Sequence, residues 1–229
     1  MEQAVDARKQ AAAEAALDLI HPGMLLGLGT GSTARFFIEA LGQRVARGLD
    51  VTGIPTSAAT GSLAASLGIR LTDTLARPLD LAVDGADEIA PDLRLIKGRG
   101  GACTREKLVA LAARKLVIIA DDAKLVPRLG QGVLPVEVLP FLWRQTAARL
   151  EALGATAQLR GSPAKPYVTD NGNLILDLQF PAPLDDPDAL ARTLKQLPGV
   201  VEHGLFTNLP TVCLVGGDAG VRVLDSSAP

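Results

Sequence analysis

Apolar and polar positions alternate along the first 120 residues in a pattern of helices and short strands. Residues 3–20 carry apolar side chains at helical spacing and end before Pro22-Gly23, which predicts an opening helix. The run Leu116–Ala120 is apolar without alternation, which is typical of a parallel strand covered on both faces. Further strands are predicted at residues 24–28, 51–54, 69–71 and 79–83, and helices at 34–46, 58–67 and 106–114. This order predicts an α/β fold, a doubly wound Rossmann-like open sheet.

A different pattern follows residue 130. Strands are predicted at 135–139, 156–160, 167–169, 174–178 and 200–206, and helices at 141–153 and 186–197. Asp170-Asn171-Gly172 predicts a hairpin with a type I′ turn, because Asn and Gly tolerate positive φ. The order β-α-β-β-α-β predicts a ferredoxin-like α+β domain.

The last apolar strand, residues 211–216, is too short to form a domain by itself. We expect it to return to the first sheet. The predicted division is therefore a Rossmann-like domain of residues 1–130 plus 207–229, with residues 131–206 inserted as the ferredoxin-like domain.

Composition narrows the class of protein. The 229 residues are 48% hydrophobic and 21% charged with a formal net charge of -2, which is typical of a globular chain and not of a disordered one. Near-neutral charge and few aromatic residues argue against a nucleic-acid binder. Two cysteines and two histidines provide neither a disulfide framework nor many metal ligands. With no signal-peptide pattern and no long apolar run, we expect a cytoplasmic protein without membrane contact.

A glycine-rich loop at residues 27–33 follows a predicted strand and opens a predicted helix. Its backbone N–H groups and the positive helix end can cradle a phosphate. Neither a P-loop lysine nor the third glycine of the dinucleotide fingerprint is present. The alternative is a tight turn in which Ser or Thr acts as the helix N-cap.

Two further segments carry candidate chemistry. Residues 84–88, Asp-Gly-Ala-Asp-Glu, follow a predicted strand, and crowded carboxylates suit acid–base work; the alternative is a solvated turn. Residues 97–101 combine glycines with Lys97, which could stabilise an oxyanion. Glu106 follows in the first turn of a predicted helix, where a surface Glu commonly compensates the helix dipole.

Together these segments resemble the ribose-5-phosphate isomerase type A family. The resemblance is carried by Thr-Gly-Ser-Thr at 30–33, Asp-Gly-Ala-Asp-Glu at 84–88, Lys-Gly-x-Gly-Gly at 97–101 and Thr-Arg-Glu-Lys at 104–107. It continues through residues 120–124, 134–138, 168–173 and 198–201 and covers nearly the whole chain.

The resemblance implies an aldose–ketose isomerase of the non-oxidative pentose phosphate pathway that interconverts ribose 5-phosphate and ribulose 5-phosphate through an enediolate. It implies that Glu106 is the base, assisted by Lys97, Asp84 and Asp87. The residues expected to bind the substrate are Thr30, Gly31, Ser32, Thr33, Asp84, Gly85, Ala86, Asp87, Lys97, Gly98, Arg99, Gly100, Lys124 and Lys9. The family implies no cofactor and no metal, and a homodimer or a dimer of dimers.

Arg99 departs from the Lys-Gly-Gly-Gly that is common in the family. A non-glycine residue is tolerable there if φ stays negative. We expect the Arg99 side chain to lie at the rim of the site and to attract the dianionic substrate.

Two rival functions come from other classes. A non-catalytic sugar-phosphate sensor would bind the same ligand but would not need Glu106 together with Lys97. A nucleotide-dependent dehydrogenase is disfavoured by the incomplete glycine fingerprint. Turnover of ribose 5-phosphate without added cofactor distinguishes the three.

Overall fold

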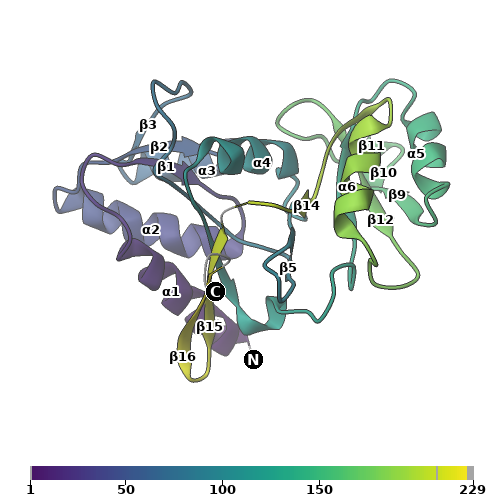
Figure 1. Ribbon diagram of the computed structural model, residues 1–229. Coiled ribbons are helices and arrows are strands. Elements are labelled where there is room, and N and C mark those ends of the chain that lie inside the picture. Colours follow the sequence, from purple (N-terminus) through teal and green to yellow (C-terminus); the bar gives the residue numbers. More distant parts are fainter. Residues whose placement is uncertain (1, 210, 226–229) are drawn as a thin grey trace. The chain divides into compact units, whose positions relative to one another are not determined.

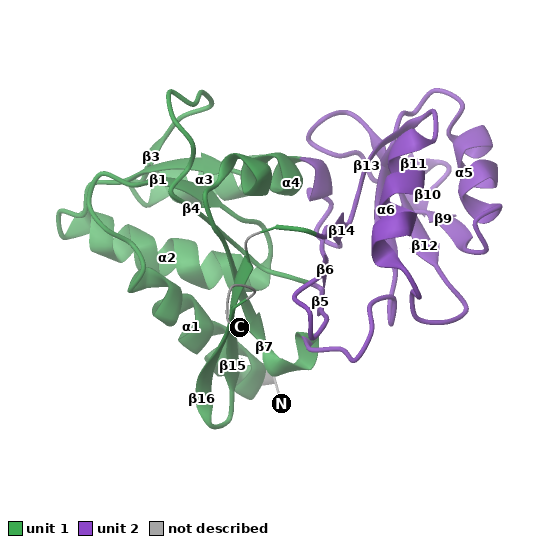
Figure 2. Ribbon diagram, viewed as in Figure 1, with its two compact units in different colours: residues 1–86, 105–124, 208–229 green, residues 87–104, 125–207 purple. Residues whose placement is uncertain are grey.

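The computed structural model describes residues 2–209 and 211–225 (Figure 1). The chain divides into two compact units (Figure 2): unit 1 is residues 1–86, 105–124 and 208–229, and unit 2 is residues 87–104 and 125–207. Residues 87–104 and 125–130, which the sequence pattern assigned to the first domain, therefore cluster with the second. Residues 1, 210 and 226–229 of the expected first domain lie outside the described residues. No helix in the described part of the chain is long and apolar enough to span a membrane.

Unit 1 is built on a sheet with the strand order β16-β15-β7-β4-β1-β2-β3, in which all neighbours are parallel except β15 and β16. Its strands are β1 (Leu25–Leu28), β2 (Thr52–Pro55), β3 (Arg70–Leu71), β4 (Leu81–Asp84), β7 (Leu116–Asp121), β15 (Thr211–Gly217) and β16 (Gly220–Asp225). The parallel pairing of β15 with β7 is the predicted return of the last apolar strand to the first sheet. Strand β16 was not predicted.

The helices of unit 1 are α1 (Glu2–Leu17), α2 (Ser32–Ala46), α3 (Ala58–Ser66) and, from Arg105 onward, α4 (Cys103–Ala112), with a short 3₁₀ helix η1 at Asp122–Lys124. Leu26 and Leu28 of β1 join one buried cluster with residues of α1, α2 and α3. Successive side chains on a strand point to opposite faces. Gly27 accordingly faces the other way, where a Cβ on it would lie 2.4 Å from Val109 Cγ1 of α4. This glycine lets α4 pack closely against β1.

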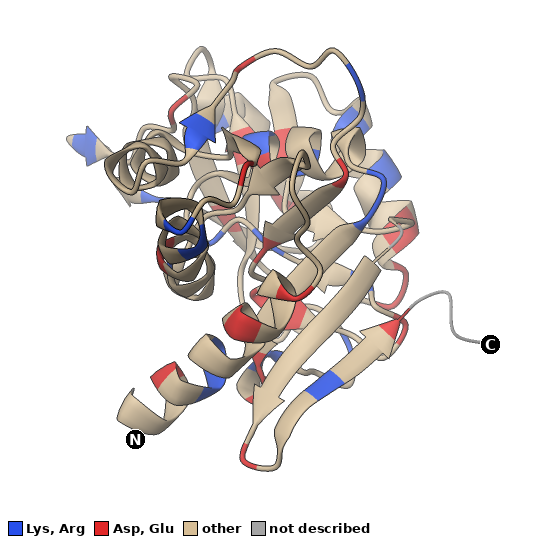
Figure 3. Ribbon diagram, turned by 90° about the vertical axis from the view of Figure 1, so that its left-hand side faces the viewer, with Lys and Arg blue, Asp and Glu red and all other residues tan. Residues whose placement is uncertain are grey.

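Charges of both signs lie along α1 (Figure 3). Arg8 of α1 forms ion pairs with Asp122 of η1 (2.8 Å) and with Asp218 in the β15–β16 turn (2.6 Å). The backbone of α1 also packs against β15, because a Cβ on Gly216 would lie 2.0 Å from the Arg8 carbonyl oxygen. These contacts tie the first helix to the last hairpin of unit 1.

Unit 2 contains an antiparallel sheet with the order β13-β8-β12-β9. Its strands are β8 (Leu134–Val138), β9 (Thr156–Leu159), β12 (Leu174–Gln179) and β13 (Val200–His203), and its helices are α5 (Trp143–Glu151) and α6 (Pro187–Gln196). Asp186 caps α6 by accepting a hydrogen bond from the Ala189 N–H (2.9 Å). A smaller sheet of β14 (Leu205–Phe206), β6 (Leu95–Ile96) and β5 (Glu88–Ile89) and a short hairpin of β10 (Gly161–Ser162) and β11 (Lys165–Pro166) complete the unit.

Two local predictions in unit 2 are wrong. The turn at residues 170–172 is not type I′, because Gly172 has positive φ (78°) and Asn171 does not. The Gly172 N–H donates to the Thr169 carbonyl (2.9 Å), so a type I turn precedes a left-handed glycine. The strand expected at 200–206 is interrupted at Gly204, whose carbonyl accepts from the Lys97 N–H (2.9 Å) and whose N–H donates to Pro135 (2.8 Å). The chain thereby leaves one sheet and enters the other.

Candidate active site

The glycine-rich loop of unit 1 lies between β1 and α2. Gly31 occupies the N-cap position of α2 with φ of 115°, and no side chain caps the helix. The alternative interpretation, in which Ser or Thr is the N-cap, is therefore wrong. The first N–H groups of α2 receive no side-chain cap, which leaves the positive end of the helix dipole to act on a ligand.

Thr30 is held by a cluster of hydroxyl groups from the β2–α3 connection and the first turn of α3. Its Oγ1 lies 2.7 Å from the Thr56 hydroxyl, 2.9 Å from the Ser57 hydroxyl and 3.2 Å from the Thr60 hydroxyl. Ser57 is also the N-cap of α3 and accepts from the Thr60 N–H (3.1 Å). A cavity of about 340 Å³ borders this loop and is lined by Thr30, Gly31, Arg35, Ile38, Ala59, Thr60 and Leu63.

Asp84 lies beside the same loop, at the end of the neighbouring strand β4. Its Oδ1 accepts from the Thr30 N–H (3.0 Å) and from the Gly85 N–H (2.7 Å), and the residue is 3% exposed. A Cβ on Gly29 would lie 2.1 Å from this oxygen, so glycine is needed for the close approach. The structure thus brings Asp84 and the predicted phosphate loop together at the carboxyl ends of two parallel strands, as open α/β sheets require of a ligand site.

Glu106 lies in the first turn of α4 and is 3% exposed. The interpretation as an exposed surface residue is therefore wrong. It precedes Val109 by one helical turn, and Val109 packs against Gly27 of β1. The packing of α4 thus brings Glu106 within about one turn of the strand that leads into the 29–31 loop.

The two cations expected near the phosphate come from different elements of unit 1. Lys9 lies on α1 and pairs with Asp6 (3.4 Å), and Lys124 ends η1. The Arg8–Asp122 ion pair joins these two elements. In the part of the chain that the structure describes, no group of three or more His, Cys, Asp or Glu side chains is arranged to hold a metal ion.

The glycine-rich loop of unit 2 begins with Lys97, which is 2% exposed. Its ammonium lies 5.4 Å from the centre of the Phe206 ring. Gly98 and Gly101 have φ of 95° and 89°, a region that glycine adopts without strain. The expectation for Arg99 is confirmed in this respect, because Arg99 is not among the described residues with positive φ.

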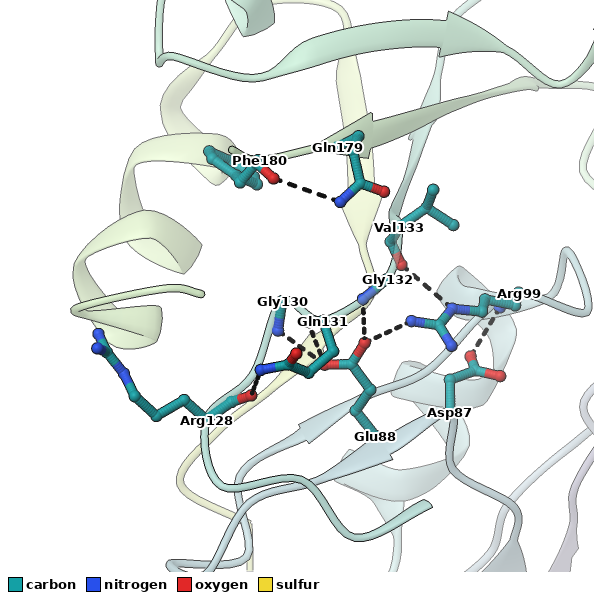
Figure 4. Close-up of polar contacts among 10 residues, drawn as sticks. All are labelled: Asp87, Glu88, Arg99, Arg128, Gly130, Gln131, Gly132, Val133, Gln179 and Phe180. Carbon is teal, nitrogen blue, oxygen red and sulfur yellow. Dashed lines mark hydrogen bonds and ion pairs between the residues drawn. The ribbon is translucent and has the colours of Figure 1, made fainter. Parts of the chain in front are cut away.

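The prediction for Arg99 did not anticipate a partner for its side chain. Its Nη2 donates to Glu88 Oε1 (2.6 Å) and its Nε to the Val133 carbonyl (3.3 Å), as Figure 4 shows. The backbone N–H of Arg99 donates to Asp87 Oδ2 (2.9 Å). Neutralisation by a buried carboxylate weakens the field that this guanidinium can project.

The carboxylates at residues 84–88 were expected to lie close together, but they are divided between the two units. Asp84 belongs to unit 1, whereas Asp87 and Glu88 belong to unit 2. Glu88 is 2% exposed and accepts from the N–H groups of Gly130 (2.7 Å), Gln131 (3.2 Å) and Gly132 (2.7 Å). Each carboxylate thus has its own donors, and Glu88 is a structural acceptor.

Glu137 is a buried polar centre that sequence reasoning missed. This residue of β8 is fully buried and accepts hydrogen bonds from four side chains: Thr104 (2.5 Å), Thr169 (2.9 Å), Asn171 (3.1 Å) and Asn173 (2.8 Å). The available signal was a Glu in an apolar strand, Leu-Pro-Val-Glu-Val, together with the polar segment 169–173.

The predicted site residues are thus distributed over both units. Unit 1 carries Lys9, residues 30–33, Asp84, Gly85, Ala86, Glu106 and Lys124, whereas unit 2 carries Asp87, Lys97, Gly98, Arg99 and Gly100. The chain passes between the units inside two of the motifs, after Ala86 and after Thr104.

Comparison with known proteins yields one family. The model of ribose 5-phosphate isomerase A (phosphoriboisomerase A) matches residues 52–220. The ribose-5-phosphate isomerase A of Thermomicrobium roseum is 51% identical over 96% of this chain and 94% of that protein. The enzyme of the same name from Methanothermobacter thermautotrophicus is 47% identical over 94% of this chain and 96% of that protein.

Solved structures give the same result. A D-ribose-5-phosphate isomerase in complex with phospho-erythronic acid is 40% identical with a TM-score of 0.92, over 96% of this chain and 99% of that one. The ribose 5-phosphate isomerase from Plasmodium falciparum is 38% identical with a TM-score of 0.93, over 97% of this chain and 100% of that one.

Proposed function

The chain belongs to the ribose 5-phosphate isomerase A family, and we propose that it interconverts ribose 5-phosphate and ribulose 5-phosphate through an enediolate. The observation that carries the proposal is Glu106, a carboxylate buried in the first turn of α4. A base that removes a proton next to a carbonyl works best when water is excluded and its geometry is fixed. The comparisons give no support to the non-catalytic sensor.

In the proposed reaction Glu106 takes the proton from C2 of the open-chain aldose. The electron pair forms the C1–C2 double bond of the enediolate while the carbonyl oxygen becomes negatively charged. A proton then passes from the C2 hydroxyl to O1, which leaves the negative charge on O2. Glu106 returns its proton to C1 as the C2 carbonyl forms, so one carboxylate serves both directions without any redox cofactor.

The phosphate of the substrate is assigned to residues 30–33 of unit 1. Support comes from the start of α2, where Gly31 has positive φ and no side chain caps the helix. The Thr30 hydroxyl cluster holds the loop in one conformation before any ligand arrives. Lys9 and Lys124 are the proposed countercharges.

Lys97, Asp84 and Asp87 are assigned to ring opening and to the sugar oxygens. A buried ammonium next to an aromatic ring is suited to stabilise a developing oxyanion. The Asp84 carboxylate accepts the N–H groups of Thr30 and Gly85 through Oδ1, and an ionised carboxylate can accept about four hydrogen bonds, so it is suited to bind sugar hydroxyl groups. Gly85, Ala86, Gly98 and Gly100 would contribute backbone groups to the substrate, next to Arg99, whose own N–H and carbonyl bond to Asp87 and Arg160.

The proposal also covers architecture and assembly. The order β13-β8-β12-β9 supports a ferredoxin-like domain inserted into a Rossmann-like catalytic domain. A homodimer or a dimer of dimers and a cytoplasmic location are carried over from the resemblance. Sedimentation velocity at several protein concentrations tests the assembly.

The decisive experiment measures turnover of ribose 5-phosphate without added cofactor, in wild type and in Glu106→Gln. We expect the substitution to lower kcat by roughly 10²–10⁴-fold while the substrate Kd changes little, because Gln keeps the shape but cannot accept the proton. Glu151→Gln, the same change at an exposed position of α5, is the matched control. Calorimetric binding without turnover by wild type would favour the sensor instead, and activity lost in EDTA and restored by a divalent metal would overturn the metal-free route.

A further inference from the structure

We infer that the Arg99–Glu88 ion pair is a positioning device that holds Asp87 and the backbone of the 97–101 loop in their working geometry. This inference rests on the proposed function, since it assigns a role to residues that support Asp87. The starting observation is how Arg99 is held. Its side chain and its N–H have separate partners within unit 2, Glu88 and Asp87 (Figure 4). Its carbonyl has a third partner in the same unit, Arg160.

The need for such a device follows from the sequence of the loop. Arg99 is flanked by Gly98 and Gly100, and Gly98 and Gly101 have positive φ. Glycine loses more conformational entropy on ordering than any other residue, so this backbone is weakly restrained by itself. Arg99 is the residue between Lys97 and Gly101 whose side chain can restrain it.

The restraint is strong because its partner is buried and fixed. The Glu88 side chain is 3% exposed and the Arg99 side chain 31% exposed, with 2.6 Å between Nη2 and Oε1. Glu88 also accepts the N–H groups of residues 130–132, and a Cβ on Gly132 would lie 2.5 Å from Arg99 Nη2. Charge-assisted hydrogen bonds of this kind are about twice as strong as neutral ones.

The restraint reaches Asp87 through the backbone. The Arg99 N–H donates to Asp87 Oδ2 (2.9 Å), while the Arg99 carbonyl accepts from Arg160 Nη1 (2.9 Å). Arg160 is itself paired with Asp177, with bonds of 2.9 and 2.5 Å. A shift of the Arg99 backbone would therefore move the donor that orients the Asp87 carboxylate. Arg99 and Glu88 are positioning residues and need not touch the reacting atoms.

The test compares Arg99→Met, which removes the charge at similar length, with Arg99→Lys, which keeps the charge but loses the planar fork. We expect Arg99→Met to lower kcat by roughly 10-fold or more with a smaller change in KM, because misplaced catalytic groups act on the transition state. Arg99→Lys should recover part of the kcat. Arg94→Met is the matched control: Arg94 is similarly exposed (33%) and pairs with Asp92 and Asp188, outside the proposed site.

A double-mutant cycle with Glu88→Gln tests whether the two residues act as a pair. We expect the double variant to lose about as much kcat as either single variant, since one interaction is removed in all three. Independent, multiplicative losses would overturn the inference, and so would kcat within about twofold of wild type for Arg99→Met. A change in KM and salt dependence alone would show a steering charge and would equally overturn it. If Glu88→Gln does not fold, the Arg99 series decides alone. Absence of turnover in wild type would instead contradict the proposed function.

Discussion

In unit 1 the Thr30 side chain is held by uncharged hydroxyl groups, whereas in unit 2 the Arg99 side chain is held by a charged carboxylate. The Thr30 hydroxyl forms hydrogen bonds with three other hydroxyl groups. A Cβ added to Gly31 would have no described atom within 4 Å. Arg99 bonds to a buried carboxylate, and Gly98 is packed directly against Cys103. The two loops are both rich in glycine, yet they are restrained by different forces.

The difference matches the chemistry proposed for each loop. The hydroxyl groups that hold the Thr30 side chain add no negative charge to a loop that receives a phosphate dianion, whose backbone already donates to one carboxylate, Asp84. A loop that aligns a lysine and a carboxylate benefits from strong, directional supports, which fix an angle as well as a position. The predictions below test this contrast, from the largest expected effect to the smallest.

The largest effect is expected from Glu137→Leu in unit 2. The change removes the acceptor of four side-chain donors, one of which is Thr104 at the start of α4. We expect the free energy of unfolding to fall by about 3–5 kcal/mol, because buried donors without partners are costly. Trp143 is the only tryptophan of the chain and lies in α5, so its fluorescence in urea reports on unit 2.

The control for this substitution is Gln158→Leu, at an exposed position of the neighbouring strand β9. It should change the unfolding free energy of unit 2 by no more than about 0.5 kcal/mol. Equal urea midpoints for Glu137→Leu and Gln158→Leu would show that the Glu137 cluster does not stabilise the unit.

Alanine at the two loop glycines compares the supports directly. Both positions have positive φ, but a Cβ at Gly98 would lie 2.4 Å from Cys103 Cβ whereas a Cβ at Gly31 has no described neighbour within 4 Å. We expect Gly98→Ala to cost about 2–4 kcal/mol of unfolding free energy and Gly31→Ala only about 1 kcal/mol, the strain of the backbone alone. Circular dichroism during urea unfolding measures both. A larger loss for Gly31→Ala would reverse the comparison.

A smaller effect is expected where the neutral support is removed. Thr30→Val keeps the volume but deletes the hydroxyl that meets Thr56, Ser57 and Thr60. We expect a loss of about 1–2 kcal/mol in unfolding free energy, together with a higher KM for the sugar phosphate. Thr30→Ser keeps the hydroxyl and should restore KM. If Val and Ser behave alike, the hydroxyl cluster does not position the loop.

Local features of both loops could be predicted from the sequence. A strand, a glycine-rich turn and a helix N-terminus follow one another within a few residues. The geometry of residues 29–33 could therefore be predicted from the local sequence, without any distant partner. The negative φ of Arg99 could be predicted for the same reason, because the steric rule applies to the residue itself. The return of β15 to the first sheet could be predicted because the strand at 211–216 follows a complete ferredoxin-like pattern and is too short to form a domain by itself.

Features that depend on distant partners could not be predicted. Glu88 and Arg99 are 11 residues apart, and the N–H donors of Glu88 lie 42 to 44 residues further along the chain. Glu137 collects donors 32 to 36 residues away. The burial of Glu106 depends on how α4 packs on β1 at Gly27, which no local pattern encodes. Burial and ion pairing are therefore the properties in which the expected and observed sites differ most.

The last prediction concerns an uncharged group in the core of unit 1, and its pH dependence disappears at neutral pH. Cys213 of β15 is fully buried, and burial raises the pKa of its thiol to about 12. The folded state therefore holds this proton more tightly than the unfolded chain, where a cysteine ionises near pH 8.5. The resulting stabilisation is complete below the unfolded pKa and is lost as the pH rises from there towards 12. We expect the stability difference between wild type and Cys213→Ala to shrink by up to about 1.4 kcal/mol per pH unit in that window. Circular dichroism in urea at a series of alkaline pH values measures it, and a difference that does not vary with pH would contradict a buried neutral thiol.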